Sequence, residues 1–513
     1  MGNQESSQKD GENLLSLPNG WIGVPLGEIA ISISPGFPSG RHNKEKKGVL
    51  HFRPMNISVT GEIDLSVEKY VEESDYHPLL KGDIIFNNTN SPELVGKTTY
   101  VKQDTNWAYS NHMTKIRVNT TLLDPAWIAS FLHTKYLQGY FKMQCTHHVN
   151  QASINSSYLS QRVYVPLPPL HEQLRIVTKI EELFTQLDAG VASLKKVQAQ
   201  LKRYRQAILK AAFEGRLTQE WREERKGKIE PADVLLKGIE QDRNNFGERS
   251  KKRHVASHSG ALQNLPEGWA WAIVDQILQP NRICSYGVLQ PGEDLIEGVL
   301  FVRVGDINEG KIALEGMKKI SPSISEQYPR TLLEGDEVLM TLVGAIGRTA
   351  VVPKSLAGAN VARAVGVIPV SNNLNPKWVE LWFRYPPKVA EMTSKSHEVA
   401  RKTLNLEDVR AAFVAIPPKD EQDKAVNEIE RLFSIADEVE HTLETSLKQA
   451  DTLRQSILKQ AFEGKLAPQD PNDEPALILL ERIKAEKAHH TAETKKGKTL
   501  QPKSPKRKIK NGN

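Results

Sequence analysis

Residues 206–217 read QAILKAAFEGRL, and residues 455–466 read QSILKQAFEGKL. PLPPLHEQ from Pro166 precedes the first stretch and AIPPKDEQ from Ala415 precedes the second, and both pairs are 249 residues apart. Other landmarks recur in the same order: Leu17-Pro18-Asn19-Gly20-Trp21 with Leu265-Pro266-Glu267-Gly268-Trp269, Leu79 to Asp83 with Leu332 to Asp336, Gly96-Lys97-Thr98 with Gly347-Arg348-Thr349, and Trp127 with Trp378. Since a unit of about 250 residues can bury its own core, the chain is predicted to contain two copies of one unit with pseudo-twofold symmetry.

A long helix is predicted after each Pro-Pro pair, Pro168-Pro169 and Pro417-Pro418. Apolar residues then recur at a mean spacing of about 3.4, near the period of a left-handed coiled coil. They are Leu174, Val177, Ile180, Leu183, Leu187, Val191, Leu194, Val197, Leu201, Tyr204 and Ile208 in the first copy, and Val426, Ile429, Leu432, Ala436, Val439, Leu443, Leu447, Ala450, Leu453 and Ile457 in the second. Gly215 and Gly464 suit helix ends. The first helix is expected over residues 171–214, roughly 65 Å at about 1.5 Å per residue.

The rest of each copy has short β-rich runs separated by turn residues, which predicts a mixed α/β (α+β) domain. The expected fold is therefore two globular domains separated by two long antiparallel coiled-coil helices. The predicted segments are a disordered N-terminus (1–13), a globular domain (14–165), a helical spacer (166–220), a charged linker with a short helix (221–262), a second globular domain (263–414), a second helical spacer (415–467) and a short helix with a basic disordered tail (468–513).

The net charge of +6 comes from the C-terminal tail. Residues 484–513 contain ten Lys or Arg and two Glu, which leaves residues 1–483 close to neutral. Cys145 and Cys284 are far apart and in no metal-ligand spacing, which is typical of a reducing cytosol. No apolar run of about 18 residues occurs, so neither a membrane partner nor a membrane span is expected and a cytoplasmic location is predicted.

The sequence lacks the usual motifs of catalysis. Residues 91–98 resemble a phosphate-binding loop, but Ser91 replaces its first glycine and Leu342 stands at the matching position of the second copy. The pairs His147-His148 and His489-His490 lack the companions of a metal site, so they are expected to be surface histidines and no metal site is predicted. We therefore interpret the chain as a binding protein.

A polar loop precedes an arginine-bearing strand in each globular domain. Copy one reads SPGFPSGRHNKEKKGVLHFRPMNISVTGEID and copy two reads SYGVLQPGEDLIEGVLFVRVGDINEGKI, so the frame is shared and the loops differ. Two half-sites on a DNA duplex produce this pattern, because phosphate contacts stay similar while base contacts change. A solvated basic loop is the alternative. The candidate DNA contacts are Arg41, Lys44, Lys46, Lys47, Arg53 and Lys97 in the first domain and Arg303, Arg348 and Arg363 in the second; for Arg53 and Arg303 a structural salt bridge is an equal alternative.

The duplicated LPxGW, LxGD, PPxxEQ and ILKxAFEGxL motifs resemble the specificity subunit of type I restriction-modification systems over about residues 14–487. The resemblance implies two target-recognition domains, each reading half of an asymmetric, interrupted double-stranded DNA sequence, with the long helices as a ruler. It also implies two adenine-N6 methyltransferase subunits and restriction-translocase subunits as partners. S-adenosylmethionine, ATP and Mg²⁺ would belong to those partners, leaving this chain non-catalytic and without a cofactor of its own.

By the same resemblance, the conserved ends of the helices pack on each other and receive the methyltransferase subunits. The residues implied are Glu172, Gln173, Phe213, Glu214, Gly215, Glu421, Gln422, Phe462, Glu463 and Gly464. One alternative is an assembly scaffold for a dimeric enzyme without sequence readout of its own, although a scaffold facing identical partners should keep identical loops. Another is a nuclease with an unrecognised site, although no acidic cluster repeats.

Overall fold

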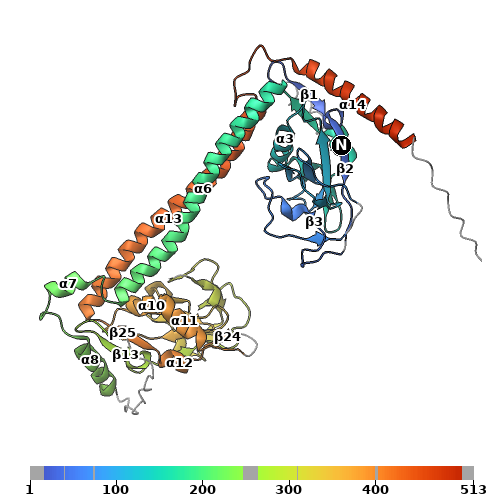
Figure 1. Ribbon diagram of the computed structural model, residues 1–513. Helices are drawn as coiled ribbons and strands as arrows, with labels where there is room; N and C mark the ends of the chain where they lie inside the picture. Colours follow the sequence, from blue (N-terminus) through green and yellow to red (C-terminus); the bar gives the residue numbers. More distant parts are fainter. Residues whose placement is uncertain are drawn as a thin grey trace, which may run out of the picture. The chain divides into compact units, whose positions relative to one another are not determined.

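The computed structural model describes residues 17–39, 41–72, 76–246, 264–308, 310–398 and 402–499 (Figure 1). Side chains are described for these residues except 397–398 and 491–499. The chain divides into unit 1, residues 1–194 with 445–513, and unit 2, residues 195–444. The predicted disordered segment 1–13 lies outside the described residues. Residues 17–165 are called domain 1 below and residues 264–414 are called domain 2.

Domain 1 is built on an antiparallel sheet with strand order β2 (Ala30–Pro35), β9 (Met113–Val118), β5 (Ile84–Asn87) and β7 (Thr98–Tyr100). Helix α3 (Pro125–Leu137) packs on β5 and β7. Its Trp127 is fully buried with Phe86 and Ile116. A second sheet pairs β3 (Val49–Phe52) in parallel with β8 (Ala108–Tyr109) and antiparallel with β4 (Tyr70–Val71).

Smaller elements complete domain 1. Strand β1 (Ile22–Pro25) pairs with β12 (Tyr164–Leu167), and β6 (Thr89–Asn90), β11 (Ala152–Ser153) and β10 (Thr146–His147) form a three-stranded sheet. The remaining helices are α2 (Leu26–Ile29), η1 (Pro54–Asn56), α4 (Tyr140–Gln144) and α5 (Ser156–Arg162). The domain is therefore mixed α and β, as predicted.

Domain 2 repeats this topology. Its main sheet has the order β14 (Ser285–Tyr286), β22 (Val365–Ile368), β19 (Val338–Thr341) and β20 (Thr349–Val351), covered by α10 (Pro376–Arg384). The counterparts of the other strands are β15 (Val299–Val302) with β21 (Asn360–Val361) and β18 (Lys318–Ile320), β13 (Ala270–Ile273) with β25 (Phe413–Ile416), and β23 (His397–Glu398) with β24 (Lys402–Thr403). Strands β16 (Ile307–Asn308) and β17 (Lys311–Ile312), and helices η2 (Val274–Gln276), η3 (Val304–Asp306), α9 (Pro322–Ser325), η4 (Pro329–Thr331), η5 (Lys354–Leu356), α11 (Pro386–Ser394) and α12 (Leu406–Arg410) complete it. The predicted internal repeat is confirmed.

The two long helices, α6 (Leu170–Phe213) and α13 (Lys419–Phe462), contain 44 residues each and are antiparallel (Figure 1). In unit 1 Asp188 pairs with Arg454, and in unit 2 Arg205 pairs with Asp437 at 2.6 Å. Arg205 follows Asp188 by 17 residues along α6, and Asp437 precedes Arg454 by 17 residues along α13, as expected for an antiparallel pair. Several members of the predicted apolar stripe are exposed, because two helices cover only one face of each other; these are Leu174, Val197, Tyr204, Val439 and Leu453.

Both helices end in the same motif. Gly215 and Gly464 have φ angles of +68° and +66°, a region open to glycine. The next N–H groups, of Arg216 and Lys465, donate to the carbonyls of Ala211 and Gln460 at 2.9 and 2.8 Å. These bonds satisfy carbonyl groups that the end of a helix leaves open.

The predicted linker is partly structured. Helix α7 (Gln219–Glu224) and α8 (Ala232–Asn245) follow α6, and α8 packs on β13 of domain 2. Its counterpart, α14 (Ala476–Thr499), packs on α2 of domain 1. The short helix predicted within residues 468–513 is therefore present and continues into the basic segment as far as Thr499. The residues after it, like residues 247–263 of the linker, lie outside the described residues.

One sequence match is out of register with the structure. The sequence matches Leu79 to Asp83 with Leu332 to Asp336. In the structure, the amide of Leu80 donates to the Asp83 carboxylate at 2.9 Å. In the same way, the amide of Glu334 donates to the Glu337 carboxylate at 2.7 Å. Glu337, one residue past the matched Asp336, therefore replaces Asp83. Both buried carboxylates pair with an arginine, Arg117 or Arg282.

Candidate nucleic-acid interface

The glutamines that recur at the start of both long helices are structural. Gln173 and Gln422 are fully buried. Each side-chain amide donates to a proline carbonyl at 2.9 Å, that of Pro168 or Pro417. Each side-chain oxygen accepts the backbone N–H that precedes α3 or α10, from Asp124 at 3.1 Å or Asn375 at 2.9 Å. Both residues therefore attach the start of a long helix to the adjacent domain by hydrogen bonds. Their side chains are inaccessible to a partner subunit.

The glutamates beside them are also buried. Glu421 accepts hydrogen bonds from the Thr218 hydroxyl, the Arg222 guanidinium at 3.1 Å and the Trp269 indole at 3.0 Å. Glu172 lies beside Trp21, and within the described part of the chain its Oε1 has no hydrogen-bond partner. Burial raises the pKa of Glu172.

The helix ends are packed against tryptophans. Phe213 contacts Trp378 at a ring distance of 4.9 Å, and Phe462 contacts Trp127 at 4.7 Å. A Cβ on Gly215 or Gly464 would lie 2.4 or 2.5 Å from Pro266 or Pro18. Six of the residues implied for docking are therefore buried and hold the fold together: Glu172, Gln173, Phe213, Gly215, Glu421 and Gln422. Phe462 and Gly464 are partly exposed, and docking of the methyltransferases at the helix ends stays a prediction. Glu214 and Glu463 are partly exposed and still available for a partner.

The DNA contact predicted for Lys97 is contradicted by the structure, because this residue lies inside domain 1. Its side chain is 6% exposed, and its Nζ donates to the carbonyl oxygens of Pro54, at 3.0 Å, and Ile57. Desolvation lowers the pKa of Lys97. Its ammonium therefore supports the turn after β3 and cannot reach a DNA phosphate.

Three other candidate cations are exposed but paired. Lys46 pairs with Glu68 and Lys47 with Glu45, both at 2.6 Å, with about two thirds of each lysine side chain exposed. Arg303 binds Asp306 through two nitrogens, at 3.1 and 3.0 Å, as the salt-bridge alternative predicted. Exposed pairs of this kind contribute little to stability, so the lysines can exchange a carboxylate for a phosphate.

The other candidates are accessible. Arg41, Lys44, Arg348 and Arg363 are exposed and Arg53 is partly exposed. Arg53 and Arg348 form no ion pair with any residue in the described ranges. Their role in DNA binding stays a prediction.

In each domain, the start of the differing loop lies beside a turn at one end of the domain. In domain 1, Phe37 at the start of the polar loop bridges to Ser110, and β3, which precedes Arg53, runs parallel to β8. In domain 2, Val288 bridges to Ala362 in the same way. The loop can pass this close to the turn only because Gly36 and Gly287 lack a side chain. A Cβ on Gly36 or Gly287 would lie 2.0 Å from the carbonyl oxygen of Tyr109 or Val361, respectively.

In each domain, the turn beside the start of the loop presents one residue at an equivalent position. The amides of Asn111 and Arg363 donate to Phe37 and Val288, at 3.1 and 2.9 Å, so Arg363 occupies the position of Asn111. Both residues are exposed. Asn111 was missed from the sequence because it carries no charge, and only the hydrogen-bond register aligns it with Arg363.

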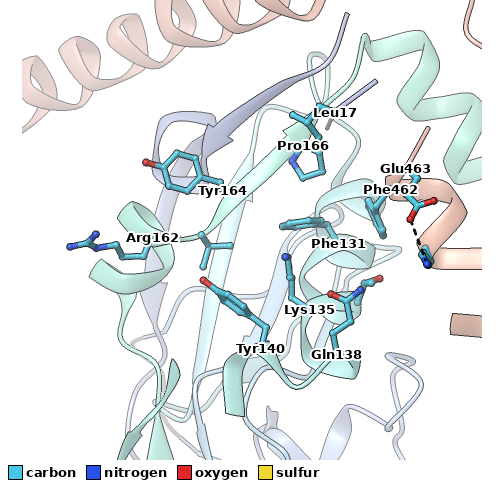
Figure 2. Close-up of a pocket in the computed structure, with 13 residues that line it drawn as sticks. Leu17, Phe131, Lys135, Gln138, Tyr140, Arg162, Tyr164, Pro166, Phe462 and Glu463 are labelled. Carbon is cyan, nitrogen blue, oxygen red and sulfur yellow. Dashed lines mark ion pairs between the residues drawn. The ribbon is translucent and has the colours of Figure 1, made fainter. Parts of the chain in front are cut away.

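Domain 1 also has a pocket of about 330 Å³ beside the end of α13 (Figure 2). Figure 2 shows Phe131, Tyr140 and Lys135 around it. Domain 2 fills the matching space with Trp382, whose indole donates to Phe413 at 2.9 Å and packs on Trp271. Phe131 takes the place of Trp382, and Gly23 takes that of Trp271. The pocket therefore arises from two missing indoles.

The described residues contain no group of three or more His, Cys, Asp or Glu side chains placed to hold a metal ion. His147 and His148 are exposed, as predicted. Within the described part of the chain, no helix is both long and apolar enough to cross a membrane.

Comparisons with known proteins agree on one family. A family model described as the type I restriction modification DNA specificity domain matches residues 18–203 and 296–449. The type I restriction enzyme EcoBI specificity subunit of Escherichia coli is 32% identical over 509 residues, covering 94% of this chain and 96% of that protein. The StySPI specificity subunit of Salmonella potsdam is 24% identical over 501 residues, covering 92% and 96%. A solved structure titled "Structural basis underlying complex assembly and conformational transition of the type I R-M system" has the same fold, with a TM-score of 0.63 at 18% identity over 88% of this chain and 99% of that chain.

Proposed function

Because this chain belongs to the family of type I restriction-modification specificity subunits, we propose that domains 1 and 2 each read one half of an interrupted double-stranded DNA sequence. The observation that carries this proposal is the matched turn at the loop-bearing end of each domain. The backbone hydrogen bonds are the same, while Asn111 in one domain is replaced by Arg363 in the other. Two domains with the same backbone hydrogen bonds but different exposed side chains suit two half-sites of different sequence.

The long helices set the spacing between the two halves. Both are continuous over 44 residues and pack on each other by ion pairs and apolar contacts. A rigid spacer imposes a fixed number of base pairs between two recognition elements. Adding or removing one turn in both helices should therefore change the unread gap in the target, and an unchanged gap would argue against the ruler.

The partners are two adenine-N6 methyltransferase subunits and restriction-translocase subunits. In this proposal the chain is non-catalytic, and S-adenosylmethionine, ATP and Mg²⁺ are bound by those partners. The exposed apolar residues of the coiled coil, such as Val197 and Leu453, and the partly exposed Glu214 and Glu463 provide a surface for the methyltransferases. The buried residues at the helix ends, such as Gln173 and Gln422, contribute indirectly, because they hold the helices in the conformation that presents this surface.

The proposal is tested by single-molecule methylation mapping of host DNA with the gene intact, deleted and restored. Loss of one interrupted adenine motif on deletion, and its return on restoration, is the expected result. An unchanged map, with the methyltransferase subunits present and active, would support the alternative of a scaffold without sequence readout. Cleavage of DNA by the purified chain with Mg²⁺ alone would instead support a nuclease.

A further inference from the structure

The β10–β11 ribbon of domain 1, residues 146–153, projects into solvent beside the loop-bearing end. All six residues from Thr146 to Gln151 are exposed, and the side chain of Val149 at the tip is 98% exposed. A turn closes the ribbon through a 2.7 Å hydrogen bond from the His148 amide to the Gln151 carbonyl.

The base of the ribbon is fixed to the core. Cys145, Ala152 and Ile154 flank the tip and are buried in the core of domain 1. Strand β11 also pairs with β6, so the ribbon continues a small sheet. A buried base and an exposed tip position the polar side chains without a large ordering cost on binding.

Hydrogen bonds connect the ribbon directly to the turn that carries Asn111. The amide of Asn88 donates to the His112 carbonyl at 3.0 Å, and its side chain donates to the Asn111 carbonyl at 3.1 Å. The Asn88 carbonyl in turn accepts the amide of Ile154, at the end of the ribbon, at 2.9 Å. The base of the ribbon and the turn therefore lie next to each other, joined through Asn88.

The chemistry of the tip is that of a base reader. Residues 146–151 read THHVNQ and contain no Lys, Arg, Asp or Glu. Asn and Gln pair with the N6 and N7 of adenine, and an apolar side chain contacts the thymine methyl group. The side chains of Asn150 and Gln151 form no hydrogen bond with other described residues, so both amides are available for a ligand.

We propose that the β10–β11 ribbon enters the DNA major groove and reads A·T base pairs in the half-site of domain 1. Asn150 and Gln151 contact adenine and Val149 packs on a thymine methyl group. The major groove, about 12 Å wide, admits a two-stranded ribbon. This inference rests on the proposed function, because it assigns a reading element within a domain that binds DNA.

Domain 2 carries a ribbon at the matching place with different chemistry. Strands β23 and β24 are attached by the amide of Leu404, which donates to Leu342 at 2.8 Å, as Ile154 does to Asn88. The sequence from residue 397 to 403 is HEVARKT, with three charged residues. The two segments therefore differ in sequence and charge, as the halves of an asymmetric target require.

The test compares two double variants of the full chain, each expressed with its methyltransferase subunits. Asn150→Ala with Gln151→Ala removes the amides of the tip. Gln103→Ala with Asn106→Ala removes another exposed amide pair of domain 1, near Gly82 at the opposite end of β5 from the ribbon. Methylation mapping reads the specificity, and DNA binding at several salt concentrations reads the phosphate contacts.

The tip variant is expected to lose discrimination at one or two A·T positions in one half of the motif, by about 5- to 150-fold, with the other half unchanged. The salt dependence of binding should stay the same, because no charge is removed. The control variant should keep both halves. Two intact halves for the tip variant, or uniformly weaker binding with a smaller salt dependence, would overturn the inference. Failure of the proposed function is distinguishable, because the motif would then survive deletion of the whole gene.

Discussion

The Nζ of Lys97 lies 3.0 Å from the carbonyl oxygen of Pro54 and donates a hydrogen bond to it across 43 positions of sequence. Pro54 directly follows Arg53, a candidate DNA contact, so a buried ammonium supports the segment that presents an exposed guanidinium. Lys97 is thus a structural residue behind the interface, although the sequence made it a candidate DNA contact.

Replacing Lys97 by Met should lower the free energy of unfolding by about 1–3 kcal/mol, because the buried Ile57 carbonyl loses the ammonium donor and the Pro54 carbonyl keeps only the Ile57 amide. It should leave the salt dependence of DNA binding unchanged. Chemical denaturation and binding measurements at several salt concentrations check both expectations. An unaltered stability, or a smaller salt dependence, would place Lys97 at the DNA after all.

Lys46→Gln with Lys47→Gln should have the opposite signature. The two side chains are about two thirds exposed and pair only with exposed or partly exposed carboxylates, so stability should change little. Affinity should fall for all DNA sequences, and the logarithmic salt slope should fall by up to about 2. An identical slope would remove these lysines from the interface.

Asn111 and Arg363 occupy equivalent turns, so each variant should alter a different half of the target. Arg363→Ala should relax one position in the half read by domain 2, at a cost of about 1–3 kcal/mol, as expected for loss of an arginine that reads guanine. Asn111→Ala should change only the half read by domain 1. Methylation mapping of both variants is the measurement, and changes in the same half would refute the assignment.

His133 should make domain 1 sensitive to acid. Its Nδ1 accepts the Thr98 amide at 3.3 Å, which leaves its Nε2 proton to bind the Val59 carbonyl at 3.2 Å. Burial lowers the pKa of His133 to about 4. The unfolded chain binds this proton from about pH 6.5 downward, so stability should fall between pH 6.5 and about 4, by roughly 3 kcal/mol in all.

A His133→Gln variant tests this effect, because its amide can donate to Val59 but does not titrate. The stability of the variant should fall less than that of the original chain between pH 7 and 5, measured by denaturant unfolding. Parallel losses in the two proteins would mean that other groups carry the acid sensitivity.

Filling the pocket of domain 1 should stabilise it. Phe131→Trp supplies the indole that Trp382 supplies in domain 2, and should raise the free energy of unfolding by about 0.5–2 kcal/mol. The reverse change, Trp382→Phe, should destabilise domain 2, because it opens a cavity and leaves the Phe413 carbonyl without this bond. Thermal unfolding of the two variants compares them, and a loss of stability in Phe131→Trp would mean that the pocket cannot accept the ring.

The internal repeat, the presence of two long helices, the bounds of the first of them to within one residue and the class of the globular domains followed from the sequence. Helical periodicity and the proline and glycine signals at helix ends are local properties, written in neighbouring residues. Identity of family followed as well, since the duplicated motifs are contiguous. By contrast, the sequence could not distinguish the buried Lys97 from the exposed Arg348 at the matching position, because burial depends on segments about 40 residues away.

Only the tertiary structure showed that Glu172, Gln173, Glu421 and Gln422 are interior locks rather than a docking surface. It also showed that Glu337 replaces Asp83, and that the uncharged ribbon lies beside the turn of Asn111. The physical reason is common to these cases. Hydrogen bonds between distant segments decide which polar side chains are satisfied inside the protein and which remain exposed for a ligand, and no local pattern of residues records those partners.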